Sequence, residues 1–591
     1  MKRPQRSFTA SSRAAAVVFR LVLFCFLILP VSVAASLSEE EVRDLVAGSP
    51  GKNEYPQAGA LILYRHGKLR IEEDHSKVFE SHLLVKILED RARGFGDQKR
   101  TYDQSTDSVE VVVARTWLPD LTTVPVEPKA INVITPPHLV GATIYADIKQ
   151  KVISFSSIAP GVVVEIKMRT ISRPDSADQA QGIYPYWDYE AFRASEPILR
   201  AGYTLDLPAD APDPVFSTGG GLESPVREEK NGRKTITWQR RDVPMIHSIP
   251  YMPPRVSFAP HFRFSNITGW EALGKYLAGR FYPAAAPDEA VSEKAAELTS
   301  GCRTGADSVR AICLFVSVQV RNIDLSMGLR GYKPHPAGQV LQNMYGDQLD
   351  KTALLSSMLT AAGFENYPAL TSARQMDVFD PSVPSTHQFS RMMVYVPGSF
   401  TDSTFTNSLY NETERNGLWL HPTAQYSRYG FFNWGQGNRA LVILPGGGRL
   451  SNTQDFPPEK SLSLSTASLK LEATGDVEGY FETVTDGMFD RQERNSLMDL
   501  TPVELDQYFQ RAANAVGEGT VKKSYTVSEL RDLTAASRAR LEFSAPELGI
   551  VQGDMMIVRI PQPPFGFSGM PYYPRLKERE FDFSASGPFV L

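Results

Sequence analysis

Apolar and polar residues alternate with a period of two over much of the first 250 residues. The pattern is clear in 58–74, 78–88, 108–119, 141–157, 161–170 and 235–246, and turn-forming residues separate these segments. Alternation of this kind is typical of strands with one buried face. We therefore expect an antiparallel β-rich domain, in which 58–74 forms two strands around a turn at His66-Gly67.

The period changes to that of a helix near Asn266. Apolar residues then recur at helical spacing in 267–282, 287–301, 306–323 and 346–363. The last of these segments is the best delimited, because Asp347 suits an N-cap and Gly363 suits a helix end. Strand-like segments follow at 366–373, 388–397 and 417–423. Helices followed by strands predict an α+β domain.

The final part of the chain returns to β patterning, interrupted by one expected helix at 501–517. The chain is 591 residues long, more than one core needs, so several domains are expected. The predicted fold class is therefore α+β multidomain, with a β-rich N-terminal domain, a central α+β domain and a β-rich C-terminal domain. The expected boundaries are 36–255, 256–445 and 446–591.

Residues 1–35 have the layout of a secretory signal peptide. A basic stretch precedes the apolar run 21–29, and small residues then suit cleavage near Ala34-Ala35. The apolar run is shorter than the roughly 20 residues that a membrane span needs. We expect a periplasmic or secreted protein with no membrane span after signal removal, the alternative being an uncleaved anchor.

Charge and composition exclude some classes of partner. The net charge is −5 and no basic run is present, so nothing predicts a nucleic-acid partner. The histidines of the β-rich region lack metal-ligand spacing, and we expect neither a metal nor a cofactor. After signal removal only Cys302 and Cys313 remain. Because Cys313 would lie well along a helix that Cys302 precedes, two free thiols are favoured over a disulfide.

The middle of the chain has the layout of a thiol enzyme. Such enzymes place a cysteine at a helix N-terminus, a histidine on a neighbouring strand, and an orienting Asp or Asn on the next strand. The segment 331–373 resembles the core of bacterial exported transglutaminase-like proteins, which have a papain-like fold and carry a β-rich domain of unknown function first. The resemblance covers nearly all of the mature chain and implies that the central domain is transglutaminase-like.

All three catalytic positions of that family are substituted here. The family's Gly-Asp-Cys-Lys-Asp-Lys reads Gly346-Asp347-Gln348-Leu349-Asp350-Lys351, so glutamine replaces the nucleophile. The family's Phe-Asn-His reads Phe389-Ser390-Arg391, and its Trp-x-Asp-Pro-Thr reads Trp419-Leu420-His421-Pro422-Thr423. The degenerate triad positions are thus Gln348, Arg391 and His421. Loss of one triad member usually costs several orders of magnitude in rate.

Other residues offer little prospect of rescuing the chemistry. Ser356 and Ser357 lie too far down the helix, and Ser390 would face away from Arg391. His387 would share the strand face of Arg391, but a metal site with His421 would lack further ligands. We expect Gln348 to bond to nearby backbone and Arg391 to pair with Asp347 or Asp350. Asp350 and Lys351 are interpreted as ordinary first-turn residues.

Two functional hypotheses follow. The first is a non-catalytic pseudoenzyme that binds an envelope protein, peptide or glycan, or acts as a scaffold, with Arg391 and His421 favouring an anionic ligand. The second is a cryptic transglutaminase-like peptidase or acyltransferase that uses relocated residues. A Cys, Ser or Thr side chain within about 3.5 Å of an imidazole in the cleft would favour the second hypothesis.

Overall fold

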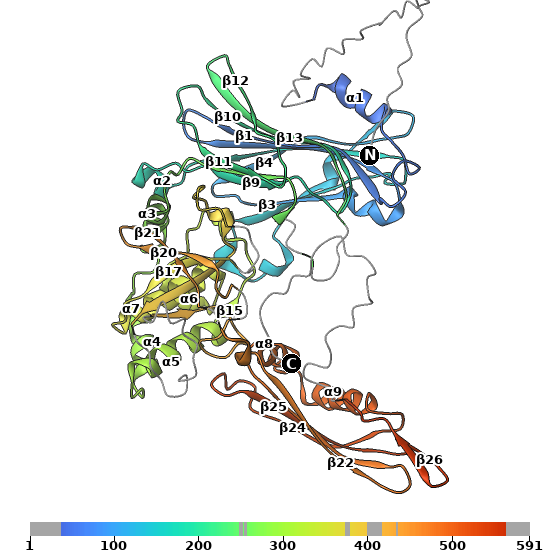
Figure 1. Ribbon diagram of the computed structural model, residues 1–591. Coiled ribbons are helices and arrows are strands. Elements are labelled where there is room, and N and C mark those ends of the chain that lie inside the picture. Colours follow the sequence, from blue (N-terminus) through green and yellow to red (C-terminus); the bar gives the residue numbers. More distant parts are fainter. Residues whose placement is uncertain are drawn as a thin grey trace, which may run out of the picture.

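The computed structural model describes residues 37–246, 252, 257–372, 379–398, 417–432, 435–454 and 456–562. The expected signal segment lies outside these residues. Three regions follow one another along the long dimension of the molecule, in chain order (Figure 1). Among the described residues, no helix has both the length and the apolar character needed to cross a bilayer.

The first region is β-rich, as predicted. After helix α1 (Glu39–Ala47), capped by Ser38, the chain forms an eight-stranded sheet and two three-stranded sheets. The eight-stranded sheet has the order β12 (Val226–Lys230), β13 (Arg233–Val243), β10 (Ile198–Pro208), β1 (Ala60–Ile71), β2 (Lys77–Ile87), β8 (Val163–Ser172), β4 (Asp107–Trp117) and β5 (Thr123–Pro125). One three-stranded sheet has the order β11 (Val215–Gly219), β14 (His261–Ser265) and β9 (Trp187–Ala191). The other has the order β3 (Asp97–Asp103), β7 (Ile148–Ser154) and β6 (Ile131–Ile134).

One apolar core joins these sheets. Trp238 of β13 stacks on Phe262 of β14 with ring centroids 4.3 Å apart, and both rings are fully buried. The large sheet is antiparallel except where β1 pairs with β10 in parallel. Because β14 pairs with β9 and β11, this region extends past the boundary expected at residue 255.

Strand β1 passes without a break through His66 and Gly67, so the turn expected there is wrong. A Cβ on Gly67 would meet the ring of Tyr203 at 3.0 Å, and the glycine therefore makes room for that ring. The chain turns instead near His75, which has a φ of 64°. The segment 141–157 is also only partly a strand, since Thr143–Tyr145 forms a short 3-10 helix before β7.

The central region is α+β. An antiparallel five-stranded sheet has the order β19 (Gly417–Leu420), β18 (Arg391–Pro397), β17 (Tyr367–Thr371), β20 (Arg439–Leu444) and β21 (Gly447–Asn452). Its helices are α3 (Trp270–Phe281), α4 (Glu289–Thr299), α5 (Gly305–Leu314), α6 (Ala337–Asn343) and α7 (Gln348–Ala361). Strand β21 lies beyond the boundary expected at residue 445.

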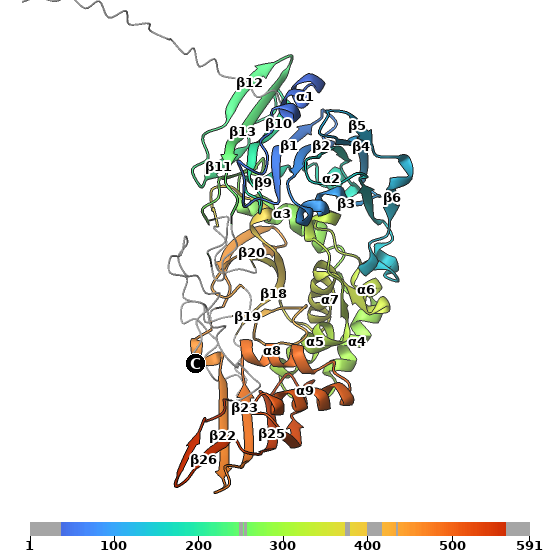
Figure 2. The same ribbon diagram turned by 90° about the vertical axis from the view of Figure 1, so that its right-hand side faces the viewer.

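Helix α7 is the axis of the central region. Met392, Val394 and Val396 of β18 face α3, α5 and α7, while Met393 faces an aromatic cluster on the opposite side of the sheet. Helices α4, α5 and α6 cover the outer side of α7, as Figure 2 shows. Buried on all sides, α7 has a fixed position relative to the sheet.

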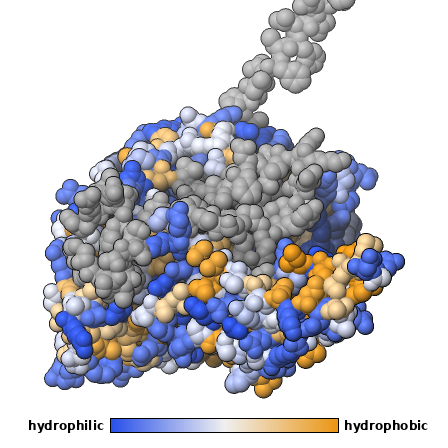
Figure 3. Space-filling view, turned by 60° about the horizontal axis from the view of Figure 1, so that its bottom comes forward, coloured by the Kyte–Doolittle hydropathy of each residue, from blue (hydrophilic) through white to orange (hydrophobic). Residues whose placement is uncertain are grey.

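The last region is a four-stranded antiparallel sheet with two helices and a hairpin. The strands are β22 (Ser463–Leu471), β23 (Val477–Thr485), β25 (Ser537–Ala545) and β24 (Val521–Val527), the helices are α8 (Met488–Leu497) and α9 (Pro502–Asn514), and the hairpin is β26 (Gly549–Gln552) with β27 (Met555–Val558). The sequence predicted α9 and missed α8. The hairpin exposes Ile550, Met555 and Ile557, and apolar residues gather toward one side of this end of the molecule (Figure 3).

A buried arginine joins the first two regions. Arg280 of α3 is 4% exposed, and its guanidinium lies 2.6 Å from Asp175 and 2.7 Å from Asp178. Its Nε also donates to the carbonyl of Gly331 at 2.6 Å. The two aspartates open helix α2 (Ser176–Gln181), which belongs to the β-rich region.

We predict that Arg280→Met lowers the free energy of unfolding by about 3–5 kcal/mol, because two carboxylates lose their buried cation. Urea unfolding followed by tryptophan fluorescence measures the change. Arg169→Met is the matched control: Arg169 also pairs with two acids, Glu80 and Glu110, but its side chain is 38% exposed. It should cost at most about 1 kcal/mol. Equal losses in the two variants would contradict the interdomain role.

Candidate functional site

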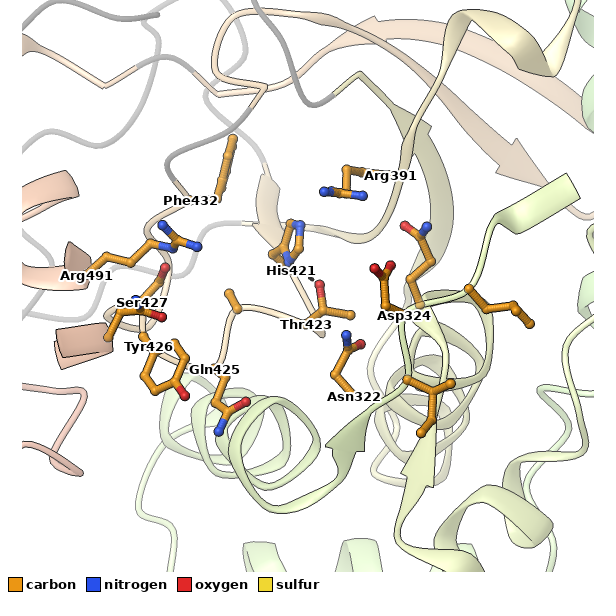
Figure 4. A pocket seen from close by; sticks show the side chains of 15 residues that line it. Asn322, Asp324, Arg391, His421, Thr423, Gln425, Tyr426, Ser427, Phe432 and Arg491 are labelled. Atoms are coloured by element: carbon orange, nitrogen blue, oxygen red, sulfur yellow. Dashed lines mark hydrogen bonds between the residues drawn. The ribbon is translucent and has the colours of Figure 1, made fainter. Parts of the chain in front are cut away.

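Gln348, Arg391 and His421 meet in one cavity of about 290 Å³. Gln348 is the first residue of α7, Arg391 the first of β18, and His421 follows the last residue of β19. Figure 4 shows Arg391 and Arg491 reaching toward His421 from opposite sides. The remaining lining residues are Asn322, Ile323, Asp324, Leu325, Thr423, Ala424, Gln425, Tyr426, Ser427, Phe432, Arg491 and Asn495.

Gln348 links the helix to the sheet. Asp347 caps α7 by accepting from the backbone N–H of Asp350 at 2.9 Å, which fixes where the first turn begins. The Oε1 atom of Gln348 then accepts from the backbone N–H of Met392 at 3.2 Å. The expected bond to nearby backbone is confirmed, and it ties the start of α7 to the start of β18.

Arg391 makes no ion pair with any residue that the structure describes. Among the described residues, its guanidinium donates only to the carbonyl of Ser390, at 3.2 Å. The expected pairing with Asp347 or Asp350 is wrong, because Arg330 holds both carboxylates, at 3.4 and 3.3 Å. Arg391 is therefore left with its charge directed into the cavity.

Asp350 and Lys351 are not ordinary first-turn residues, because both side chains are completely buried. Asp350 accepts from the backbone N–H and the ring of His335, at 2.7 and 2.9 Å, and from the hydroxyl of Tyr145. The oxygen of Tyr145 in turn accepts from the backbone N–H of Asp347. Since Tyr145 belongs to the β-rich region, the start of α7 is bonded to two regions of the chain.

The electrostatics of the two aspartates diverge. Burial acts to raise the pKa of Asp350, but the bond from His335 and the charge of Arg330 outweigh it, and the pKa falls below its usual range. Burial and the neighbouring charge of Asp350 raise the pKa of Asp347. Burial also lowers the pKa of Lys351 to about 7, although its ammonium donates to the carbonyls of Ser317 and Val320. Asp350 thus carries the anionic charge that Arg330 requires.

His421 is held in its neutral form. Burial, followed by the positive charges of Arg391, Lys351 and Arg491, lowers its pKa to about 3. Its Nδ1 lies 3.2 Å from the hydroxyl of Thr423. This is the kind of contact that would favour the cryptic-enzyme hypothesis. A base this weak accepts a proton poorly near neutral pH, however, so the geometry alone does not make a competent pair.

Two basic or amide side chains on α8 are among the lining residues that the sequence interpretation missed. Arg491 and Asn495 lie one turn apart on α8, the helix that the pattern did not reveal. Helix α8 buries Asp490, Glu493 and Arg494 beside its apolar residues. Its inward face therefore does not give an apolar stripe in the sequence. The sequence signals that could have indicated α8 were Gly487 before the helix and the apolar residues Phe489 and Leu497 within it.

The other residues considered for chemistry lie elsewhere. Ser356 is buried and donates to Asn366, and His387 lies 3.8 Å from Asp188 at the border with the β-rich region, outside the cavity. His387 precedes β18 instead of sharing its face. No group of three or more possible metal ligands occurs among the described residues. Cys302 and Cys313 are free thiols, and Cys313 is buried with its pKa raised to about 12 by burial.

We predict that Asp350→Asn lowers the free energy of unfolding by about 3–5 kcal/mol, because Arg330 loses its buried counter-charge and an amide meets the donors of His335. Asp324→Asn is the matched control, since Asp324 is exposed and makes no ion pair with a described residue. It should change stability by at most about 0.5 kcal/mol. Thermal and urea unfolding of both variants provide the comparison. An Asp350→Asn protein as stable as the parent would show that the buried charge is dispensable.

Comparison with known proteins supports the architecture. Residues 73–247 match DUF3857, a domain family of unknown function with a solved structure. A crystal structure of a candidate protease from Parabacteroides distasonis superposes with a TM-score of 0.57 at 14% identity, covering 83% of this chain and 93% of that one. An M1 zinc metallopeptidase from Deinococcus radiodurans covers 35% of this chain and 43% of its own, with 13% identity and a TM-score of only 0.19.

No curated protein matches the chain in sequence. At 14% identity the candidate protease shares the fold alone, across nearly its whole length. The β-rich region therefore matches DUF3857 over residues 73–247, and the protein from Parabacteroides distasonis shares the multidomain fold.

Proposed function

We propose that the central region is a transglutaminase-like domain that has lost its chemistry and serves as a non-catalytic binding or scaffold module of the cell envelope. The observation that carries this proposal is the convergence of Gln348, Arg391 and His421 on one cavity. Each replaces a member of the cysteine, histidine and aspartate set that the sequence resemblance implies. Three replacements in a preserved frame favour loss of the reaction over loss of the fold.

The chemistry of each replacement supports the same conclusion. A carboxamide cannot form the thioester on which acyl transfer depends, and the oxygen of Gln348 is already bonded to Met392. Arg391 stays protonated and cannot act as a base near neutral pH. His421 stays neutral but is too weak a base to activate a hydroxyl.

The second candidate function is hydrolysis or acyl transfer through Thr423, and it rests on the contact between Thr423 and His421. The two residues are two positions apart in one turn, so local geometry accounts for the contact without a catalytic role. Among the described residues, no acidic side chain forms a hydrogen bond that would orient the imidazole of His421. This candidate is therefore the less favoured of the two.

Export to the periplasm or beyond is part of the proposal, since the layout of residues 1–35 supports a signal peptide. Peptides, proteins and glycans of the envelope are then the partners within reach. The β-rich first and last regions offer further surfaces for a scaffold role.

We predict no turnover when the mature protein is incubated with amine donors, glutamine-containing peptides or cell-wall fragments. Mass spectrometry of the substrates detects any product. Turnover that survives iodoacetamide but disappears in both His421→Ala and Thr423→Val would establish the cryptic enzyme instead. Ser427→Ala, which alters a hydroxyl on the same cavity wall without touching His421, is the control variant.

We predict that Gln348→Cys creates a reactive thiol but no acyl-transfer activity. A thiol at the N-terminus of α7 and near Arg391 should titrate below the ordinary value of about 8.5, because both stabilise the thiolate. The rate of alkylation against pH measures this, with the parent protein reporting the background from Cys302 and Cys313. The triple variant Gln348→Cys, Arg391→His, His421→Asp should regain measurable turnover. Turnover by the single variant would show that a competent base is already present.

A further inference from the structure

The cavity holds two guanidiniums that come from different regions of the chain. Arg391 starts β18 of the central region, and Arg491 lies on α8 of the last region. Within the described part of the chain, the guanidinium of Arg491 makes no hydrogen bond or ion pair, and the guanidinium of Arg391 bonds only to the carbonyl of Ser390. In Figure 4 both side chains point toward His421, which lies between them.

Two facing guanidiniums repel each other unless an anion lies near both. Burial lowers the pKa of Arg491, because removal of the guanidinium from water destabilises its charged form. The charges of Arg391 and Arg491 both depress the pKa of His421, so both act on the same point. Asp324 is the single acid among the described lining residues, and it forms an ion pair with neither arginine. The cavity therefore has an excess of positive charge that an anionic ligand would neutralise.

The remaining wall suits peptide groups. The side-chain amides of Asn322, Gln425 and Asn495 make no hydrogen bond with other described residues, and each offers a donor and an acceptor. A backbone amide needs one of each. The cavity volume of about 290 Å³ lies just below the range of about 300–1,000 Å³ for small-ligand pockets, so it can take the end of a chain but not a long segment.

We propose that this cavity binds the free α-carboxylate of a peptide, held between Arg391 and Arg491, with the amide side chains pairing to the last peptide groups. Arginine is suited to this task because its planar fork donates two parallel bonds to a carboxylate. A single-charge carboxylate is favoured over a phosphate dianion, because Arg391, Arg491 and Asp324 leave one net positive charge, which a monoanion neutralises and a dianion would exceed. The assignment rests on the proposed non-catalytic function of the same site.

The last region of the chain is then a component of the binding site. Arg494, which follows Arg491 by three residues on α8, is completely buried and pairs with Asp490 at 2.8 Å. It also donates to the carbonyls of Leu530 and Ala535, which fixes α8 against the loop before β25. The position of Arg491 therefore follows from the fold of the last region, and the ligand would join that region to the central one.

Calorimetric titration of the mature full-length protein with N-acetyl-Ala-Ala tests the proposal. The same dipeptide with an amidated carboxyl terminus, glucuronate and inorganic phosphate form the comparison arms. The free acid should bind at least tenfold more tightly than the amide, because loss of a charged hydrogen-bond partner corresponds to roughly a tenfold to hundredfold change in Kd. Equal affinity for acid and amide, or no binding of the acid, would overturn the proposal, as would preferential binding of glucuronate or phosphate.

Variants identify the groups responsible. Arg391→Gln and Arg491→Gln should each weaken binding of the free acid roughly tenfold or more, and each should abolish the preference for acid over amide. Arg511→Gln, an exposed arginine on α9 in the same region, is the matched control and should bind like the parent. Unchanged binding in Arg491→Gln would remove the last region from the site. Circular dichroism and the unfolding midpoint show that each variant is folded.

The failure of this proposal can be told apart from the failure of the proposed function. Mass spectrometry of the dipeptide after the titration reports cleavage or transfer. Product formation would overturn the non-catalytic function, whereas an intact dipeptide that does not bind would overturn only the carboxylate assignment. Binding of an intact dipeptide with acid preference supports both.

Discussion

The buried carboxylate of Asp350 is the constraint on which the rest of the structure depends. A completely buried anion is costly unless cations and donors surround it, and here they come from distant segments: Arg330 and His335 from the loop before α6, and Tyr145 from the β-rich region. Helix α7 can therefore reach its final position only when the first two regions are assembled. Because Gln348 is two residues from Asp350, the same assembly fixes one wall of the cavity.

A second buried ion pair acts in the same way on the opposite side of the cavity. Arg494 and Asp490 anchor α8 within the last region, and Arg491 then projects into the space beside His421. The cavity thus lies where the central and last regions meet, and no one of the three regions forms it alone. Polar groups buried at regional borders carry a cost, but they specify one arrangement of the regions where an apolar contact would tolerate several.

Local sequence signals predicted much of the fold and less of the site. The helix at 348–361 follows from the Asp347 cap and its apolar residues. The convergence of Gln348, Arg391 and His421 follows from the order of one helix and two strands. The turn expected at His66-Gly67 failed because Gly67 accommodates the ring of Tyr203, a partner far away in the sequence. For a related reason, Asp350 was interpreted as an ordinary first-turn residue and Arg491 was missed. Their roles depend on Tyr145 and on the docking of α8, and neither leaves a local sequence pattern.

The surroundings of His421 support the proposal that this cavity serves recognition instead of catalysis. A catalytic imidazole needs a pKa near the working pH and an anion that stabilises its charged form. Here His421 stands where the sequence resemblance implies the orienting aspartate, and its neighbours are the basic side chains of Arg391, Lys351 and Arg491. Such surroundings penalise any step that creates an imidazolium, but they favour an anion that arrives from outside. The charges that disable a base are therefore the charges that would hold a carboxylate, so the proposed lack of catalysis and the proposed binding of an anion rest on the same side chains.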